Sequence, residues 1–435
     1  MLKSGTLLSK LRAHPLIDLL FTLRGNPRVN ILIEPLWGIP HSLIAPFSAV
    51  YMRAMGISDV QIGIALSAAM LVQVFCAFFG GIIADKFGRK NTTIFGDIIG
   101  WVIPCAIWAG AQNYWFFLAA MVLNGFEQVN QTAWVCLLVE DAQEKDILNL
   151  WNWVAISGLL AVFFSPISGA LITRFSLIPV MRILYGVFSL NMLIKCFITV
   201  KWVSETAQGK VRKAETKGVS VGSMLAGYWQ IIPQMLRNSG VMRVLAIMVL
   251  MGITTMIGSN FYSLYATALG LPEKYLAFFP MIRACIMLLF FFVIQHRLNK
   301  FRVKIPMAVG FVFYMLCQLL VIFSPKNTIW PFLLYTFFEA VAFGLVFPRK
   351  ELMTAALVDK QERARIMALL TTLMIALMVP FGGITGALSK IDGRLPFVLA
   401  LWLFVISFVV IVTMKQNPGG DMEEDEDGSS QGLRP

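Results

Sequence analysis

Carboxyl groups stand inside long apolar stretches of this 435-residue chain, where they can do proton chemistry. Glu34 is followed by Trp37 and His41, three and seven residues later, and this spacing places all three on one face of a helix. A buried carboxyl group can bind and release a proton, so Glu34 is a candidate proton carrier and His41 a second titratable candidate. If the helix begins later, Glu34 lies at the interface with water and has no such role.

A second apolar stretch carries a polar stripe. Four side chains recur there at helical spacing: Asn124, Glu127, Gln128 and Gln131. A polar face in an apolar helix cannot point at lipid. The stripe therefore either lines an aqueous cavity that binds solute or protons, which we favour, or joins helices through hydrogen bonds.

Three polar residues stand out in the second half of the chain. Arg283 keeps its charge at any depth, so it needs a carboxylate partner, a water-filled cavity or an anionic substrate. Glu339 is the first expected partner; the pair either binds solute, switches between states, or is a structural ion pair only. Asn260 is a further candidate for binding solute.

Lys195 belongs to the first half of the chain. It lies near the end of its apolar stretch and is expected to extend to the membrane surface without a role.

The composition defines the solvent of this chain. Of the residues, 58% are hydrophobic and 14% are charged, against roughly 25% charged in soluble domains. The mean hydropathy of +0.74 excludes a water-soluble globular protein and a disordered chain, so a lipid bilayer is expected around it. The net charge of +12 comes from Lys and Arg in short runs between apolar segments, which excludes a nucleic-acid partner. No metal site and no cofactor are predicted.

Twelve stretches are apolar and long enough to span a bilayer. They lie near 30–52, 59–84, 93–112, 114–137, 148–172, 177–200, 241–268, 274–296, 304–324, 329–348, 365–388 and 394–414. The excess of Lys and Arg in alternate loops predicts that both termini are cytoplasmic, in a plasma membrane. The expected divisions are a cytoplasmic segment (1–29), a first bundle (30–200), a linker with an interfacial helix (201–240), a second bundle (241–414) and a disordered acidic cytoplasmic tail (415–435).

An internal repeat supports two related bundles of six helices. Asp85-Lys86-Phe87-Gly88-Arg89-Lys90 is echoed by Asn299-Lys300-Phe301-Arg302-Val303-Lys304. Because six is even, both halves have the same orientation, and a site between them at mid-depth is expected. The predicted fold is an all-α membrane protein with twelve transmembrane helices in two pseudo-symmetric bundles.

The loop between the second and third spans carries a family signature. Gly81-Ile82-Ile83-Ala84-Asp85-Lys86-Phe87-Gly88-Arg89-Lys90 resembles the G-x-x-x-D-(R/K)-x-G-R-(R/K) motif of the major facilitator superfamily (MFS), matched at every defined position. The resemblance implies a conformational latch in which Asp85 caps the eleventh span and Arg89 meets Glu140 or Asp141. Gly81 and Gly88 would permit close helix approach and a tight turn. A plain cationic loop is the alternative reading.

These observations predict a secondary transporter that moves a small organic solute by alternating access. Proton-coupled efflux is favoured, since Ser165-Pro166-Ile167-Ser168-Gly169 loosely resembles part of the family's antiporter motif. Glu34 and Glu127 would carry protons. The alternatives are a proton-coupled importer of a nutrient or organic anion, and a non-transporting receptor or scaffold. An enzyme is not expected, and the expected partners are solute, protons and lipid, with the chain a monomer.

Overall fold

The computed structural model describes residues 22–293, 303–356 and 363–413. These residues form helices joined by turns, and no strand occurs among them. The predicted all-α class is confirmed. The predicted tail (415–435) and most of the predicted N-terminal segment (1–29) lie outside the described residues.

Nine helical segments of the described chain are long and apolar enough to cross a bilayer. They lie in α6 (Asp59–Phe87), α7 (Arg89–Asp97) with η2 (Ile98–Val102) and α8 (Ile103–Ala109), α11 (Glu144–Val162) with α12 (Ser165–Phe175), α13 (Leu177–Trp202), α16 (Ser239–Ala268), α19 (Lys304–Ile322), α20 (Trp330–Ala356), α21 (Arg363–Ile391) and α22 (Leu395–Thr413). The predicted first and fourth spans are interrupted, and α17 (Phe278–Val293), in the eighth, has 16 described residues. A multi-pass membrane protein is supported, whereas the count of twelve spans stays a prediction.

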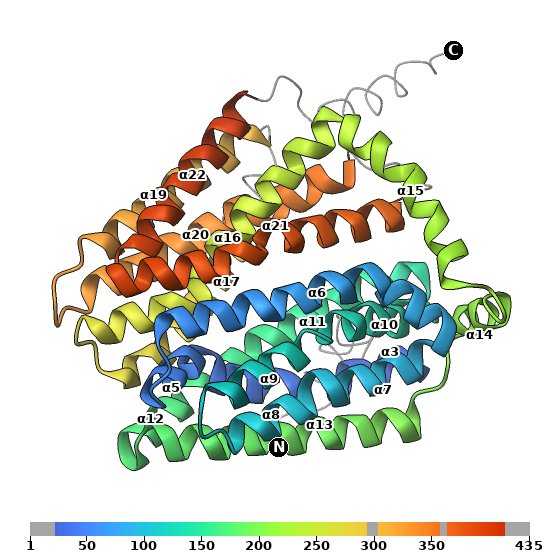
Figure 1. Cartoon of the computed structure of the whole chain (residues 1–435), viewed down its shortest axis with the longest axis horizontal. Coiled ribbons are helices and arrows are strands. Elements are labelled where there is room, and N and C mark those ends of the chain that lie inside the picture. The colour runs from blue at the N-terminus through green and yellow to red at the C-terminus, as the bar shows by residue number, and fades with distance from the viewer. Residues whose placement is uncertain (1–21, 294–302, 357–362, 414–435) are drawn as a thin grey trace, which may run out of the picture.

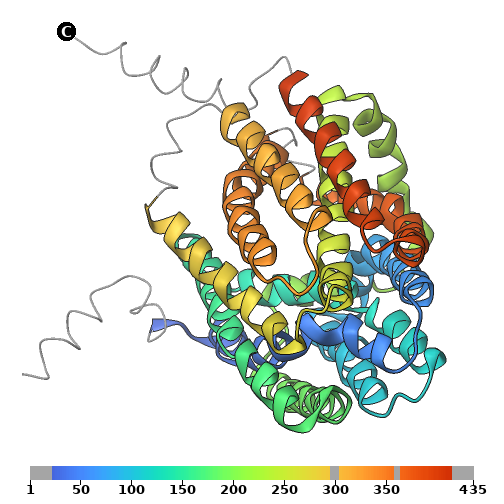
Figure 2. The same ribbon diagram turned by 90° about the vertical axis from the view of Figure 1, so that its left-hand side faces the viewer.

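Two layers of helices build the molecule. In Figure 1 the blue-to-green helices of residues 22–202 lie below α16 and α19 to α22, whereas the yellow α17 lies beside the lower layer; Figure 2 shows the same arrangement from one end. Helices α14 (Ala207–Glu215) and α15 (Val221–Arg237) lie at the right-hand end of Figure 1, which we call the linker end. The opposite end, where α5 (Ser48–Ala54) leads into α6, is the far end.

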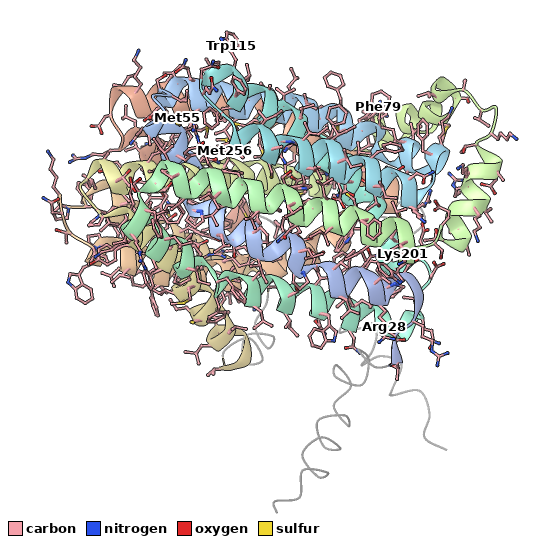
Figure 3. The ribbon with its side chains drawn as sticks, turned by 90° about the horizontal axis from the view of Figure 1, so that it is seen from below. Arg28, Met55, Phe79, Trp115, Lys201 and Met256 are labelled. Atoms are coloured by element: carbon pink, nitrogen blue, oxygen red, sulfur yellow. The ribbon has the colours of Figure 1, made fainter. Side chains whose placement is uncertain are left out.

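Side chains mark the two ends in a second view. Figure 3 shows Arg28 and Lys201 at the linker end and Met55 toward the far end.

The helices on either side of the linker are longer than predicted. Helix α13 runs to Trp202 and α16 begins at Ser239, so each extends two residues into the predicted linker (201–240).

Three spans of the first layer are interrupted beside a charged residue. The first span consists of α3 (Gly25–Ile33), α4 (Pro35–Ile44), η1 (Ala45–Phe47) and α5, and Glu34 forms its first junction. Pro35 has no N–H to continue the helical bonding, which favours a break there. The π-helical η2 directly follows Asp97, and α9 (Tyr114–Asn124) gives way to α10 (Glu127–Val139) just before Glu127. Irregular backbone at membrane depth is tolerated where it is buried in protein or lines a cavity.

The two layers touch closely at the far end. A Cβ atom on Gly63 of α6 would collide with the carbonyl oxygen of Gly382 and with the backbone of Gly386 in α21. Ser67 adds a hydrogen bond at this contact, since its Oγ donates to the Val379 carbonyl oxygen at 2.5 Å. Glycines at these positions permit backbone contact between helices that larger residues would hold apart.

A charged group strengthens the same contact. Asp59, at the start of α6, accepts hydrogen bonds from Arg53 at 2.6 Å and from Ser389 of α21 at 2.6 Å. Arg53 also donates to the Leu264 carbonyl oxygen of α16 at 2.8 Å, and Ser165 of α12 donates to that of Ala277 at 2.6 Å. The far end is therefore a built junction between the two layers.

We expect Gly63→Leu to destabilise the protein, because the added side chain must push α6 away from α21. Overpacking of this kind costs about 1–3 kcal/mol. The apparent melting temperature of the purified protein in detergent should fall. Gly186→Leu in α13 is the matched control, since a Cβ there meets nothing within 4 Å. Equal melting temperatures for the two variants would contradict the tight α6–α21 junction.

Candidate functional site

A small cavity of about 60 Å³ lies where the interrupted spans of the first layer meet. Its walls come from the α3–α4 junction, η2, α10 and α13. The lining residues are Glu34, Trp37, Trp101, Glu127, Asn130, Gln131, Trp134 and Lys195. Three predicted candidates, Glu34, Glu127 and Gln131, are thus brought to one place.

Lys195 is buried in an ion pair. Its Nζ lies 3.4 Å from Oδ2 of Asp97, and the two side chains are 5% and 1% exposed. Asn130 donates from Nδ2 to the other carboxylate oxygen of Asp97 at 2.6 Å. The prediction that Lys195 extends to the membrane surface is wrong, because Asp97 supplies the countercharge that makes its burial possible.

Two glycines bring α10 against this pair. A Cβ atom on Gly96 would come within 2.6 Å of Asn130 Cβ, and one on Gly100 within 2.9 Å of the Glu127 backbone nitrogen. Asn124 donates to the Gly100 carbonyl oxygen at 2.7 Å. The close approach of α7 and η2 to α10 therefore sets Asn130 and Glu127 beside the cavity.

Glu34 and Glu127 lack a basic partner among the described residues: neither takes part in an ion pair there. Asn124 donates a long hydrogen bond of 3.4 Å to Glu127. Glu127 is the first residue of α10, where the partial positive charge of a helix N-terminus favours a carboxylate. Lys195, the basic residue on the cavity wall, already has Asp97 as its partner.

Aromatic rings flank the two carboxyl groups. His41 stacks on Trp37 with ring centroids 4.8 Å apart and an interplanar angle of 15°. Trp101 meets both rings edge-on, at 5.6 Å from Trp37 and 6.0 Å from His41. His41 thus belongs to an aromatic cluster next to the cavity, and its part in solute or proton binding stays a prediction.

The residues of the fourth span that line the cavity differ in part from the predicted polar stripe. The α10 residues that line the cavity are Glu127, Asn130, Gln131 and Trp134, whereas Gln128 is not among them and Asn124 bonds to η2. The reason is the break at Gly125, since the helical phase restarts at Glu127. A side chain on Gly125 would collide with α6, which explains the small residue at the break.

Arg283 and Glu339 pair in the second half of the chain, as the sequence suggested. Arg283 Nε lies 2.5 Å from Glu339 Oε2, and NH2 lies 3.1 Å from Oε1, a bidentate arrangement between α17 and α20. The guanidinium carbon also lies 4.7 Å from the centre of the Phe343 ring. The side chains are 35% and 19% exposed, so this pair is more accessible than Asp97–Lys195.

Asn260 is directed to its own helix. Its Nδ2 donates to the Met256 carbonyl oxygen at 3.0 Å. Two residues on, Tyr262 stacks on Tyr335 at 4.7 Å and donates to the Phe332 carbonyl oxygen at 3.2 Å. The described contacts of Asn260 thus lie within its own helix, and its role in solute binding stays a prediction.

The loop that carries the signature motif forms a charged cluster at the linker end. Arg89, with a side chain 7% exposed, lies 2.6 Å from Asp85 and 3.2 Å from Glu140. It also donates to the Ala84 carbonyl oxygen at 3.1 Å. Of the two acids suggested for Arg89, the structure selects Glu140. Asp141 instead accepts from the Asn26 amide at 2.9 Å.

The linker helix completes this cluster. Arg212 of α14 lies 3.0 Å from the second oxygen of Asp85, and the pKa of Arg212 is raised by this hydrogen bond and by the charge of Asp85. Glu205 accepts from the backbone nitrogens of Arg89 and Lys90 at 2.8 and 3.2 Å. Asp85 was expected at the start of the eleventh span; residues 357–362 there lie outside the described residues.

The two motif glycines differ in their roles. Gly88 has a φ of +90°, and a Cβ there would collide with Glu205, so the predicted tight turn is present. The predicted close approach at Gly81 is wrong, because a Cβ there meets nothing within 4 Å. The close approach is at its neighbour Gly80, where a Cβ atom would come within 3.1 Å of the Thr132 hydroxyl oxygen. Lys86 and Lys90 donate to the carbonyl oxygens of the linker and of α13, respectively.

The layered helices and the nine apolar helical segments of the described residues are those of a multi-pass membrane protein. The family model of the Major Facilitator Superfamily matches residues 38–348, and the chain belongs to this superfamily.

Three curated relatives match parts of the chain. YqjV of Bacillus subtilis (strain 168), an uncharacterized MFS-type transporter, is 34% identical over 143 residues, 32% of this chain and 35% of that protein. The multidrug resistance protein MdtG of Serratia proteamaculans (strain 568) is 30% identical, over 39% of this chain and 42% of its own length. The multi-drug resistance efflux pump PmrA of Streptococcus pneumoniae serotype 4 is 23% identical, over 42% and 46%. The match spans less than half the length of these relatives.

Solved structures share the fold over nearly the whole chain. The nucleoside transporter NupG, in a variant form, superposes with a TM-score of 0.72 at 14% identity, covering 90% of this chain and 100% of that chain. A D-xylose-proton symporter superposes with a TM-score of 0.69 at 12% identity, covering 90% and 98%.

Proposed function

We propose that the protein exports a cationic or amphiphilic organic solute in exchange for protons, by alternating access across the plasma membrane, as a monomer. The linker end and both termini are placed in the cytoplasm. Glu34 and Glu127 alternate between a protonated state and a state that pairs with the solute. The relatives named for multidrug resistance and efflux support the direction of transport.

One observation carries this proposal: two carboxyl groups line a partly open cavity, and neither forms an ion pair among the described residues. A carboxylate in a low-dielectric site is costly unless it is neutralised. A proton or an organic cation can each supply the missing positive charge. The stacked Trp37 and His41 and the edge-on Trp101 offer flat apolar surfaces to such a cation.

The cavity is too small to hold a drug-sized solute. Drug-sized molecules occupy pockets of about 300–1,000 Å³, whereas this cavity measures about 60 Å³. The cavity therefore has to widen before a drug-sized solute can enter. The junction at the far end joins the two layers and is the contact that such a movement would break, as in repeat-based transporters.

An importer of an organic anion is the second candidate, because Arg283 is partly exposed. Its guanidinium is already bidentate with Glu339, and Lys195 is already paired with Asp97. An anion would have to break one of these pairs. The charge arrangement therefore favours a cation, and a non-transporting receptor would leave the unpaired carboxyl groups without a purpose.

Solute-driven proton flux in proteoliposomes tests the proposal. The purified protein is reconstituted, a pH gradient is imposed, and cationic, neutral and anionic organic solutes are added in turn. Movement of a cation that ceases when a protonophore collapses the gradient is expected. Flux with anions alone would favour the importer, and absence of flux with folded protein would favour a receptor.

The Arg283–Glu339 pair should act in transport and not only in stability. We expect Arg283→Met and Glu339→Leu singly to lower the unfolding free energy by about 1–3 kcal/mol, because each leaves a partly buried charge unpaired. The double variant should regain the melting temperature without regaining transport. A double variant that is both stable and fully active would reduce the pair to a structural role.

A further inference from the structure

One lysine and two glutamates share the wall of the small cavity. Lys195 reaches the wall from α13, Glu34 from the α3–α4 junction and Glu127 from α10. Asp97 does not line the cavity and holds Lys195 from behind, at 3.4 Å. Lys195 is therefore the member of the pair on the cavity wall, and Asp97 lies one ion-pair distance beyond it.

The position of Lys195 is fixed by packing. Asp97 is 1% exposed, receives the Asn130 amide at 2.6 Å, and lies next to Gly96, where α7 and α10 approach closely. Its other oxygen, Oδ2, has no hydrogen bond among the described residues beyond the ion-paired ammonium. Removing Lys195 from Asp97 would leave a buried carboxylate without its countercharge, which is strongly unfavourable.

The charges on the cavity wall set the charge of the preferred occupant. With Glu34 and Glu127 ionised and Lys195 charged, the wall carries a net single negative charge. An occupant with one positive charge neutralises it. A second positive charge on the occupant would face Lys195 in a low-dielectric site, where repulsion between like charges is large.

We propose that Lys195, positioned by Asp97, is a specificity-determining residue that restricts the cavity to organic monocations and rejects organic dications. This inference rests on the proposed transport of cationic solutes and adds the charge that the solute must have. It assigns a purpose to a buried ion pair that the proton carriers themselves do not require.

Ethidium and propidium provide a matched test, because both are phenanthridinium dyes and propidium carries a second positive charge on its side chain. Flux of each dye is measured in proteoliposomes with the same pH gradient. The wild-type protein should favour ethidium. In the double variant Asp97→Asn/Lys195→Met, the propidium-to-ethidium ratio should rise by about 5-fold, because repulsion by Lys195 at about 6 Å is partly offset by attraction to Asp97 at about 9 Å, at an effective dielectric constant of about 20.

Two further variants separate specificity from folding. Lys195→Arg keeps the charge and should keep the wild-type ratio. Asp97→Asn keeps the ammonium and releases it toward the cavity, so its ratio should not exceed that of the wild type. A melting temperature for each variant shows which of them fold.

The outcomes are distinct. A folded double variant with the wild-type ratio, or a raised ratio in Asp97→Asn, would overturn the assignment of Lys195 while leaving cation transport in place. Failure of the wild-type protein to move either dye or any other organic cation would overturn the proposed function, and the inference would fall with it.

Discussion

We expect Glu127→Gln to abolish the proposed proton-driven transport while the protein still folds; this is the largest effect that the site predicts. Gln has the shape of Glu but cannot bind or release the proton. Glu127 lines the cavity at the start of α10, and Asn124, its described hydrogen-bond partner, donates to it at only 3.4 Å. Loss of a positioned proton carrier typically costs 10²–10⁴-fold, so flux under a pH gradient should fall at least ~100-fold.

A matched variant gives this result its meaning. Glu351→Gln changes a carboxyl group that is 48% exposed and paired with Lys350, away from the cavity. It should transport as the wild type does. Melting temperatures of both variants should equal that of the wild type within a few degrees. Unchanged coupling in Glu127→Gln would remove this residue from the proton pathway and leave Glu34 as the remaining carrier.

Much of the fold follows from the sequence, because an apolar stretch of sufficient length has one favourable solution in a bilayer. Segments such as 177–200 and 394–414 correspond closely to α13 and α22. The interruption at Glu34 has a signal in the sequence, since Pro35 follows it. Those after Asp97 and at Gly125 could not be predicted, because they depend on contacts with neighbouring helices, as at Gly125 against α6.

The candidate site was predictable only in part, for a related reason. Glu34, Glu127, Arg283 and Glu339 stand out because a charge at mid-depth is costly wherever it lies. Asp97 and Lys195 lie near the ends of their apolar stretches, where a charged side chain can reach water. Only the crossing of α7 and α13 shows that they neutralise each other.

Helical phase explains a further omission. Asn130 was not predicted because the stripe was phased from Asn124, across a break that the sequence does not reveal. Glu205 follows the sixth span in a polar stretch, and its binding to the N-terminus of α7 depends on how the linker folds back. For Asn130 the sequence did hold one signal: Gly96 and Gly100 are small enough to let α10 approach α7 and η2 closely.

Arg89→Leu should both destabilise the protein and suppress transport, because one guanidinium joins two helices at the linker end. It binds Asp85 of α6 and Glu140 at the end of α10, with 7% of its side chain exposed. Without it, two poorly solvated carboxylates lose a countercharge, which costs about 3–5 kcal/mol for a buried pair. We expect a lower melting temperature and a flux reduced by ~10-fold or more.

Two comparisons test whether this effect comes from the fork of hydrogen bonds or from charge alone. Arg89→Lys keeps the charge but cannot bind three acceptors in a plane, so it should recover only part of the flux. Arg212→Gln removes the second, 40% exposed partner of Asp85 and should have a smaller effect on both measurements. If Arg89→Leu and Arg212→Gln behaved alike, Arg89 would be an ordinary basic residue of the loop. If instead flux fell in Arg89→Leu at an unchanged melting temperature, the cluster would act on the movement of the layers and not on their stability.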